Sequence, residues 1–168
     1  MTVRLENLVG ALAMRVTDDI EDQGPEILDK TVSAPGSAIT TIALHPGISI
    51  RWLSSALMLS HPGTVRLVDR LVAAELVERQ AAQSDGRAVS LHLTAKGDTL
   101  AKQLLARRGD RIAALLQSLS ESEKRQLEQI AEKLLVATYA GAATAVRTCR
   151  WCDGDACNDC PVDAAMGA

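Results

Sequence analysis

The chain is 168 residues long, enough to bury a full-sized core, and this length favours one domain with a small appendage. Hydrophobic residues make up 47% of it but include no Phe, one Tyr and two Trp, which indicates an aliphatic core of the kind that packed helices build. The formal net charge of −3 gives no general affinity for nucleic acid. No charge-free run approaches the ~18–20 apolar residues of a membrane span, so we expect a cytoplasmic protein with no membrane partner.

The first expected element is an amphipathic helix over residues 3–22. Its apolar positions recur at the three- and four-residue intervals of one helical face: Leu5, Leu8, Val9, Leu12, Val16 and Ile20. A Gly-Pro pair at 24–25 ends this run. The next stretch, residues 26–45, has a weaker helical pattern that the Pro-Gly pair at 35–36 interrupts, and Ser37 is a candidate N-cap for a short helix after the break.

Two helices separated by a tight turn are expected next. Ser49 caps the first over about 50–58, and Ser60 caps the second over 61–75, with Pro62 in the first turn, where a backbone N–H has no helical partner. Wound at 100° per residue, the second helix has a buried stripe formed by Val65, Val68 and Val72. Its opposite, exposed face holds Gly63, Arg66, Leu67 and Arg70. Such a pair of helices forms a helix-turn-helix pattern.

A β-hairpin follows the second of these helices. Residues 76–80 and 88–93 are short runs of alternating character. Between them, residues 83–87 contain an Asp-Gly pair, which is a strong turn signal. Arg87 is therefore expected at the tip of the hairpin.

The last two expected helices are long. Thr94 caps one over about 95–118, and a capping box formed by Ser120 and Glu123 opens another that reaches about residue 147. Both have leucine-rich stripes, as the N-terminal helix does, and these stripes are wider than one small domain built from the preceding helices and hairpin could cover. A second copy of the chain is a natural place to bury them, and the alternative is a monomeric helical bundle.

Helix, turn, helix and hairpin in this order form a winged helix, and the whole layout resembles the MarR family of bacterial transcriptional regulators. The likeness is carried by LSHPGTVRLVDRL at 59–71, by LVER at 76–79, and by the Asp85-x-Arg87 and Leu93-Thr94-x-x-Gly97 patterns. It covers residues 3–147 in layout and is specific over about 46–97.

The resemblance implies a mainly α fold with a small β-hairpin wing, in which a winged helix-turn-helix is flanked by N- and C-terminal dimerisation helices. The corresponding domain is 1–148, followed by a cysteine-rich tail at 149–168. Within the domain, the dimerisation helices cover about 3–22 and 95–147 and the winged helix about 37–97.

The family implies a homodimer whose two winged helices enter successive major grooves of a pseudo-palindromic operator in double-stranded DNA. The residues that this assigns to DNA binding are Ser60, His61, Gly63, Thr64, Arg66, Arg70, Asp85 and Arg87. Arginine can bind guanine bidentately, and Arg87 is long enough to enter the minor groove with Asp85 orienting it. Asp69 is interpreted as an intramolecular partner for an arginine. Members of the family often bind small aromatic acids, but no pattern here identifies such an effector, and none indicates an enzyme.

All four cysteines lie within twelve positions at the C-terminus, spaced as C-x2-C-x4-C-x2-C and followed by Pro161: Cys149, Cys152, Cys157 and Cys160. In a reducing compartment this clustering indicates metal or redox chemistry rather than a disulfide framework. A zinc ion would accept four thiolates, although structural zinc sites usually separate the two pairs by more residues. An iron–sulfur cluster is favoured, because the C-x4-C-x2-C part has the spacing of plant-type ferredoxins and Cys-Pro ends bacterial ferredoxin motifs. The third alternative is a metal-free thiol pair that oxidises reversibly.

Two functions remain open at this stage. The first is a DNA-binding regulator with a four-cysteine metal or redox sensor, whose acidic tail is expected to lie away from the operator, at the end of a dimerisation helix. The second is a small iron–sulfur or zinc protein whose winged helix mediates protein contacts.

Overall fold

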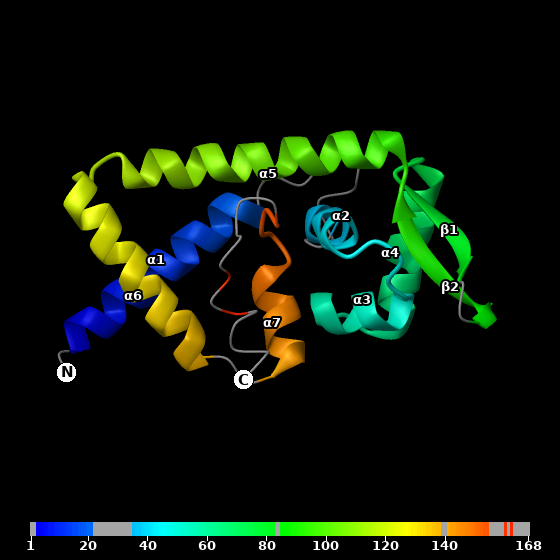
Figure 1. Cartoon of the computed structure of the whole chain (residues 1–168), viewed down its shortest axis with the longest axis horizontal. Coiled ribbons are helices and arrows are strands. Elements are labelled where there is room, and N and C mark those ends of the chain that lie inside the picture. The colour runs from blue at the N-terminus through cyan, green and yellow to red at the C-terminus, as the bar shows by residue number, and fades with distance from the viewer. Residues whose placement is uncertain are drawn as a thin grey trace.

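The structure, a computed structural model, describes residues 3–21, 35–82, 85–138, 141–154, 160 and 162. Within these residues it has seven α-helices and one antiparallel two-stranded hairpin, in the order α1–α4, β1, β2, α5–α7. The long helix α5 (Ala95–Leu116) runs along one side of the molecule and joins two regions (Figure 1). A compact winged-helix unit lies at its N-terminal end, and a helical arm lies at its C-terminal end.

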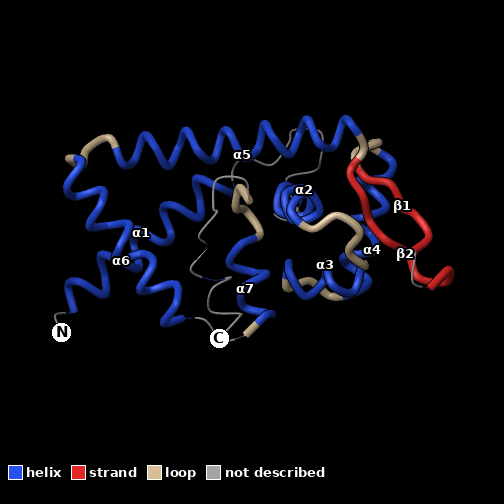
Figure 2. Tube along the Cα trace, in the orientation of Figure 1, coloured by secondary structure: helices blue, strands red, loops and turns tan. Residues whose placement is uncertain are grey.

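The winged-helix unit is built from three short helices and the hairpin. Its elements are α2 (Pro35–Leu44), α3 (Ile50–Leu57), α4 (His61–Ala73), β1 (Val77–Ala82) and β2 (Asp85–Leu93). Their aliphatic side chains share one core, with Ile39, Leu53, Leu67 and Leu91 fully buried. Ile48 adds an isolated bridge to Leu91, so the hairpin, which projects at the end of the molecule in Figure 2, is tied to the helices.

Most expected caps are confirmed. The Ser49 hydroxyl accepts a hydrogen bond from the Trp52 amide, and the Ser60 hydroxyl accepts one from the Gly63 amide. Between the two helices Met58 takes a left-handed conformation (φ 54°), which turns the chain sharply. The prediction for Ser37 is wrong, because α2 already begins at Pro35 and Ser37 is buried inside it.

The expected faces of α4 need a correction. Its fully buried stripe is Thr64, Leu67, Val68 and Leu71, at the i, i+3, i+4, i+7 spacing of a core-facing helix. Leu67 was expected on the exposed face, but it is fully buried, and Val65 and Val72 are only partly buried. The inner face is therefore rotated relative to the expected valine stripe, and of the three valines only Val68 lies fully inside it.

The junction between β1 and α5 explains the Leu-Thr-x-x-Gly pattern. Thr94 caps α5 by accepting from the Gly97 amide, and its hydroxyl also donates to the carbonyl of Glu75 at 2.6 Å. The Thr94 amide donates to the Leu76 carbonyl at 3.1 Å. A Cβ on Gly97 would lie 2.0 Å from that same carbonyl oxygen, so only glycine allows the helix to approach so closely.

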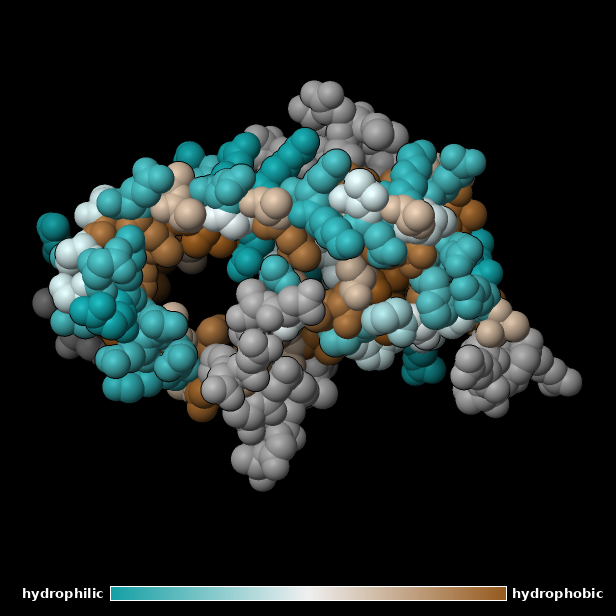
Figure 3. All heavy atoms as spheres, turned by 45° about the horizontal axis from the view of Figure 1, so that its top comes forward, coloured by the Kyte–Doolittle hydropathy of each residue, from teal (hydrophilic) through white to brown (hydrophobic). Residues whose placement is uncertain are grey.

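The helical arm consists of α1 (Val3–Glu21), the end of α5 and α6 (Glu121–Thr138). Asp19 of α1 pairs with Arg111 of α5 at 3.7 Å. Helix α6 opens with the expected capping box, in which the Ser120 amide donates to the Glu123 carboxylate at 2.8 Å. No residue of α6 is buried, and Figure 3 shows hydrophobic side chains lining the inner side of this part of the molecule. None of the described helices has the length and hydropathy that a membrane crossing requires.

The C-terminal part of the chain differs from the expectation. The last helix was predicted to continue to about residue 147, but α6 ends at Thr138. A separate helix, α7 (Ala142–Cys149), begins after Gly141. Gly141 has φ 102°, a backbone conformation that strains residues with a side chain and that glycine adopts readily. Helix α7 packs beside α3, so the chain returns from the arm to the winged-helix unit (Figure 1).

Candidate nucleic-acid interface and cysteine segment

The N-terminal half of α4 presents a basic, solvent-exposed surface. His61 and Arg66 are exposed, and Arg70, one turn further, is partly buried. Asp69 lies on the same helix, but Arg79 of β1 donates a hydrogen bond to its carboxylate at 2.7 Å. This confirms the predicted arginine partner for Asp69. The pairing offsets the one negative charge within this part of the helix.

Ser60 and Gly63 form the N-cap of this helix, and Thr64 lies beneath its exposed surface; the DNA contacts of Ser60 and Gly63 stay predictions. The Thr64 side chain is fully buried, and its hydroxyl donates to the Ser60 carbonyl at 3.1 Å. The prediction that Thr64 contacts DNA is therefore wrong, because its side chain faces the core. A Cβ on Gly63 would lie 3.1 Å from the Ser60 hydroxyl oxygen, which gives this glycine a role in the cap.

Near the tip of the wing, the structure describes the pairing of the strand backbones but not the side chains of residues 85–88. Val77–Ala81 pair with Val89–Leu93 in regular antiparallel register, and an irregularity follows at Ala82, which pairs with Asp85. Strand β2 therefore starts at Asp85, and Arg87 belongs to the strand rather than to the connection at the tip. The side chains of Asp85 and Arg87 lie outside the described residues, so their contacts with DNA and with each other stay predictions.

The first C-x2-C unit of the cysteine segment lies against the winged-helix unit. Cys149 ends α7, and the Cys152 amide donates to the Cys149 carbonyl at 2.8 Å, which makes the first C-x2-C unit a tight turn. Trp151, inside that turn, is only 8% exposed and belongs to the main core cluster. The expectation that the tail sits at the end of a dimerisation helix is therefore wrong for its first part.

The ligand set itself is only partly described. Cys149, Cys152 and Cys160 are each partly buried, and Cys157 lies outside the described residues. Among the residues that are described, no three His, Cys, Asp or Glu side chains lie close enough together to hold a metal ion. The four-cysteine metal site therefore stays a prediction.

Sequence reasoning missed two residues that hold this segment in place. The Thr40 hydroxyl of α2 donates to the Arg150 carbonyl at 2.6 Å. A Cβ on Gly36 would lie 2.6 Å from Cη2 of Trp151, so the indole packs directly on the α2 backbone. The only signal available was a tryptophan inside a C-x2-C unit of a chain that has just two tryptophans.

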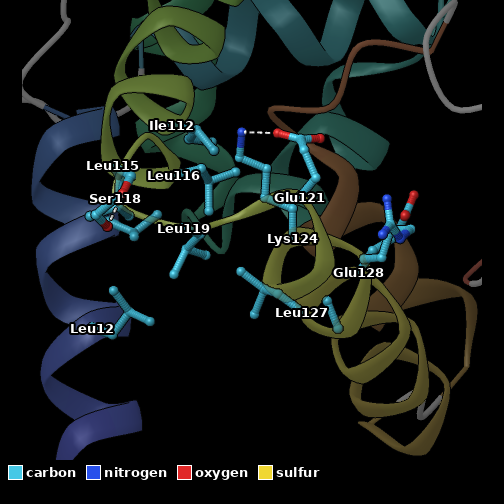
Figure 4. A pocket seen from close by; sticks show the side chains of 13 residues that line it. Leu12, Ile112, Leu115, Leu116, Ser118, Leu119, Glu121, Lys124, Leu127 and Glu128 are labelled. Carbon is cyan, nitrogen blue, oxygen red and sulfur yellow. Dashed lines mark hydrogen bonds and ion pairs between the residues drawn. The ribbon is translucent and has the colours of Figure 1, made fainter.

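An apolar pocket of about 780 Å³ opens within the helical arm (Figure 4). Leu12 of α1, Leu116 of α5 and Leu127 of α6 are among the side chains that line it. On its rim, Lys124 pairs with Glu121 at 2.7 Å. A pocket of this composition suits apolar side chains better than a charged ligand.

A helix-turn-helix with an exposed basic second helix, followed by an antiparallel wing, defines the winged-helix class, and the flanking helices give it the arrangement of MarR winged-helix structures. Residues 37–88 match the family model described as MarR family.

The chain is similar in sequence to curated proteins and in fold to solved structures. The chain is 37% identical over 83 residues to the transcriptional repressor MprA of Escherichia coli (strain K12), covering 49% of this chain and 47% of that protein. It thus spans about half the length of the first curated relatives it matches. The RV1404 structure from Mycobacterium tuberculosis has a TM-score of 0.69 at 21% identity, over 82% of this chain and 95% of that one. Streptococcus pneumoniae FabT in complex with DNA has a TM-score of 0.62 at 20% identity, over 78% and 92%.

Proposed function

We propose that the protein is a MarR-type transcriptional regulator that binds a pseudo-palindromic DNA operator as a homodimer and carries a metal centre at its four C-terminal cysteines. The observation that carries the DNA-binding part is the surface of α4. Arg66 is exposed and Arg70 is partly buried on a helix whose other face is fully buried. The match of residues 37–88 to the MarR family supports the same conclusion.

The DNA contacts divide into two kinds. His61, Arg66 and Arg70 lie on the helix that a winged helix inserts into the major groove, where arginine recognises guanine through two hydrogen bonds. Ser60 and Gly63 form the cap at the start of that helix, so their contribution is to position it. Arg87 on the wing is proposed to bind the minor groove, as the sequence pattern indicates.

The homodimer is supported by the exposed apolar side chains of the arm. Helix α1 exposes Leu5, Leu8, Val9 and Leu12, and α6 exposes Ile130, Leu134 and Val136. Large exposed apolar patches mark interaction surfaces. A second copy would cover these side chains and place its own apolar side chains in the pocket of Figure 4.

The metal centre rests on the spacing of Cys149, Cys152, Cys157 and Cys160. We favour an iron–sulfur cluster, with zinc as the alternative, since both accept four thiolates. Absorption spectra and metal analysis of anaerobically purified protein test this directly. A brown protein with stoichiometric iron and sulfide supports the cluster, one zinc per chain supports the alternative, and protein with neither metal contradicts the metal centre.

DNA binding is tested with an operator obtained by selection from random duplexes. Arg66→Ala and Arg87→Ala should each lose about 1–3 kcal/mol of operator affinity and reduce the salt dependence of binding, because each removes a contact that displaces counterions. Arg107→Ala, an exposed arginine in the middle of α5, is the matched control and should bind as the wild type does. If the wild type shows no salt-dependent binding to any duplex, a winged helix that mediates protein contacts becomes the better explanation.

A further inference from the structure

Helix α7 brings a basic stretch of the C-terminal region beside α3, the first helix of the helix-turn-helix (Figure 1). Arg147 of α7 donates a hydrogen bond to the sulfur of Met58 at 3.2 Å. Met58 forms the turn between α3 and α4, and it is exposed. We propose that Arg147 extends the DNA-binding surface by contacting a backbone phosphate next to that turn. This inference rests on the DNA binding proposed above and is independent of any metal at the cysteines.

The two segments that meet here carry basic residues and no acidic ones. Residues 45–68 and 141–152 contain no Asp or Glu, although the chain as a whole has a net charge of −3. Among their arginines, Arg51 and Arg66 are exposed and Arg147 is partly buried. Such a surface favours phosphate, because arginine contacts to phosphates release condensed counterions. The meeting of two acid-free stretches through residues 89 positions apart is the observation that carries the proposal.

The docking geometry of a helix-turn-helix places phosphates near Arg147. The second helix enters the major groove through its N-terminal residues, while the first helix crosses the DNA backbone. Helix α3 is that first helix here, and the Met58 turn lies just before the start of α4 at His61. A guanidinium on the sulfur of Met58 therefore lies beside the path expected for the DNA backbone. The thioether is a weak, uncharged acceptor, so a phosphate oxygen can replace it at little cost.

The C-terminal end of α7 is anchored, and this holds Arg147 in place. The indole of Trp151 packs on the α2 backbone, where a Cβ on Gly36 would lie 2.6 Å from Cη2. The Thr40 hydroxyl donates to the Arg150 carbonyl at 2.6 Å. Arg150 in turn donates to the Arg147 carbonyl at 2.6 Å, which closes the last turn of the helix. Because Arg147 is presented from an anchored helix, less conformational entropy is lost when it binds.

The salt dependence of binding distinguishes a phosphate contact from a structural role. With two chains bound, Arg147→Gln removes two contacts, so the logarithm of the binding constant should fall less steeply with the logarithm of salt concentration, by about 1.8 in slope. The loss of affinity should then be about tenfold larger at about 50 mM than at about 200 mM salt, and similar for the selected operator and unrelated duplexes. Arg147→Lys retains the charge and should keep the wild-type slope. Arg107→Gln, on an exposed part of α5, is the matched control and should bind as the wild type does.

Met58→Leu tests the same contact from the other side. It removes the sulfur but keeps an apolar side chain of similar size, so the salt slope should stay at its wild-type value. A purely structural role for Arg147 predicts that both substitutions lower operator affinity without changing the slope. Arg147→Met, which keeps an unbranched apolar stem, gives the test if Arg147→Gln does not fold.

The outcomes separate this inference from the function on which it rests. Wild-type protein that shows no salt-dependent binding to DNA overturns both. Wild-type binding together with unchanged affinity and slope in Arg147→Gln overturns the phosphate contact alone. A loss of affinity at the wild-type slope also overturns it, and makes Arg147 a support of the turn between α3 and α4.

Discussion

The winged-helix unit and the helical arm are made from similar aliphatic residues but reach opposite degrees of burial. In the winged-helix unit, Ile39, Leu67, Leu71 and Leu91 are completely buried within one chain. In the arm, α6 has no buried residue, and Ile130 remains 53% exposed. The first region shares a closed core with Ala101 and Leu104 of α5 and with Trp151, while the second leaves large apolar side chains exposed. The arm is therefore the region whose stability should depend on a second chain.

The largest expected effect comes from placing a charge on the exposed apolar face of the arm. Ile130→Glu should dissociate the proposed homodimer or cause aggregation, because it removes about 1.5–3 kcal/mol of apolar burial from each protomer and buries a carboxylate instead. Size-exclusion chromatography with light scattering measures the change. Gln129→Glu adds the same charge to an exposed position next to it on α6 and should leave the dimer intact. A dimer that tolerates both substitutions would show that α6 is not in the interface.

The next largest effect is expected where α5 packs closely on the winged-helix unit. Gly97→Ala should lower the free energy of unfolding by about 1–3 kcal/mol or more, because its Cβ would lie 2.0 Å from the backbone carbonyl of Leu76, which has no flexible end that could move away. Chemical denaturation gives the value. Gly109→Ala lies in the same helix with open space around it, and should be neutral or stabilise by up to ~1 kcal/mol. Equal effects at both positions would contradict the close approach at Gly97.

The same two regions show what could be predicted from the sequence. Most local hydrogen-bonding signals were dependable: the caps at Ser49, Ser60, Thr94 and Ser120 are all present, and the predicted cap at Ser37 is not. They were dependable because a cap depends on residues only three or four positions apart. The helix-turn-helix and hairpin order followed from these signals, and it identified the fold.

Features that depend on tertiary packing were predicted less well. The buried face of α4 was shifted toward the valines, so Thr64 was assigned to DNA although it faces the core. The return of the chain through α7 was missed, because the apolar pattern of the last helix continues past Thr138 and only Gly141 marks the break. Docking of Trp151 on Gly36 joins residues more than a hundred positions apart, and no local pattern encodes such a contact.

A smaller effect is expected from the ion pair beside the recognition helix. Asp69→Asn should lower stability by only about 0.2–1 kcal/mol, since the side chains of Asp69 and Arg79 are 53% and 35% exposed and the pair is partly screened by solvent. Thermal unfolding in low and high salt measures this, and the difference from wild type should shrink as salt rises. Arg79→Gln, which removes the other partner, should give a similar loss, and the double substitution should cost little more than either alone. Strictly additive losses would show that the pair does not interact in solution.

The smallest expected effect belongs to the capping box of α6 and depends on pH. The Ser120 hydroxyl, and after it the Ser120 backbone amide, donate to the Glu123 carboxylate and lower its pKa. Because the folded-state pKa is depressed, the cap stabilises α6 at pH values above the pKa of an unfolded glutamate. This contribution is lost as the pH falls through the folded-state pKa. Glu123→Gln should therefore melt slightly below wild type at neutral pH and together with it in acid, where both side chains are neutral. Glu132→Gln, in the same helix but beyond the cap, is the control and should show no such convergence. A difference between wild type and Glu123→Gln that persists unchanged in acid would mean that the ionised carboxylate is not what stabilises the start of this helix.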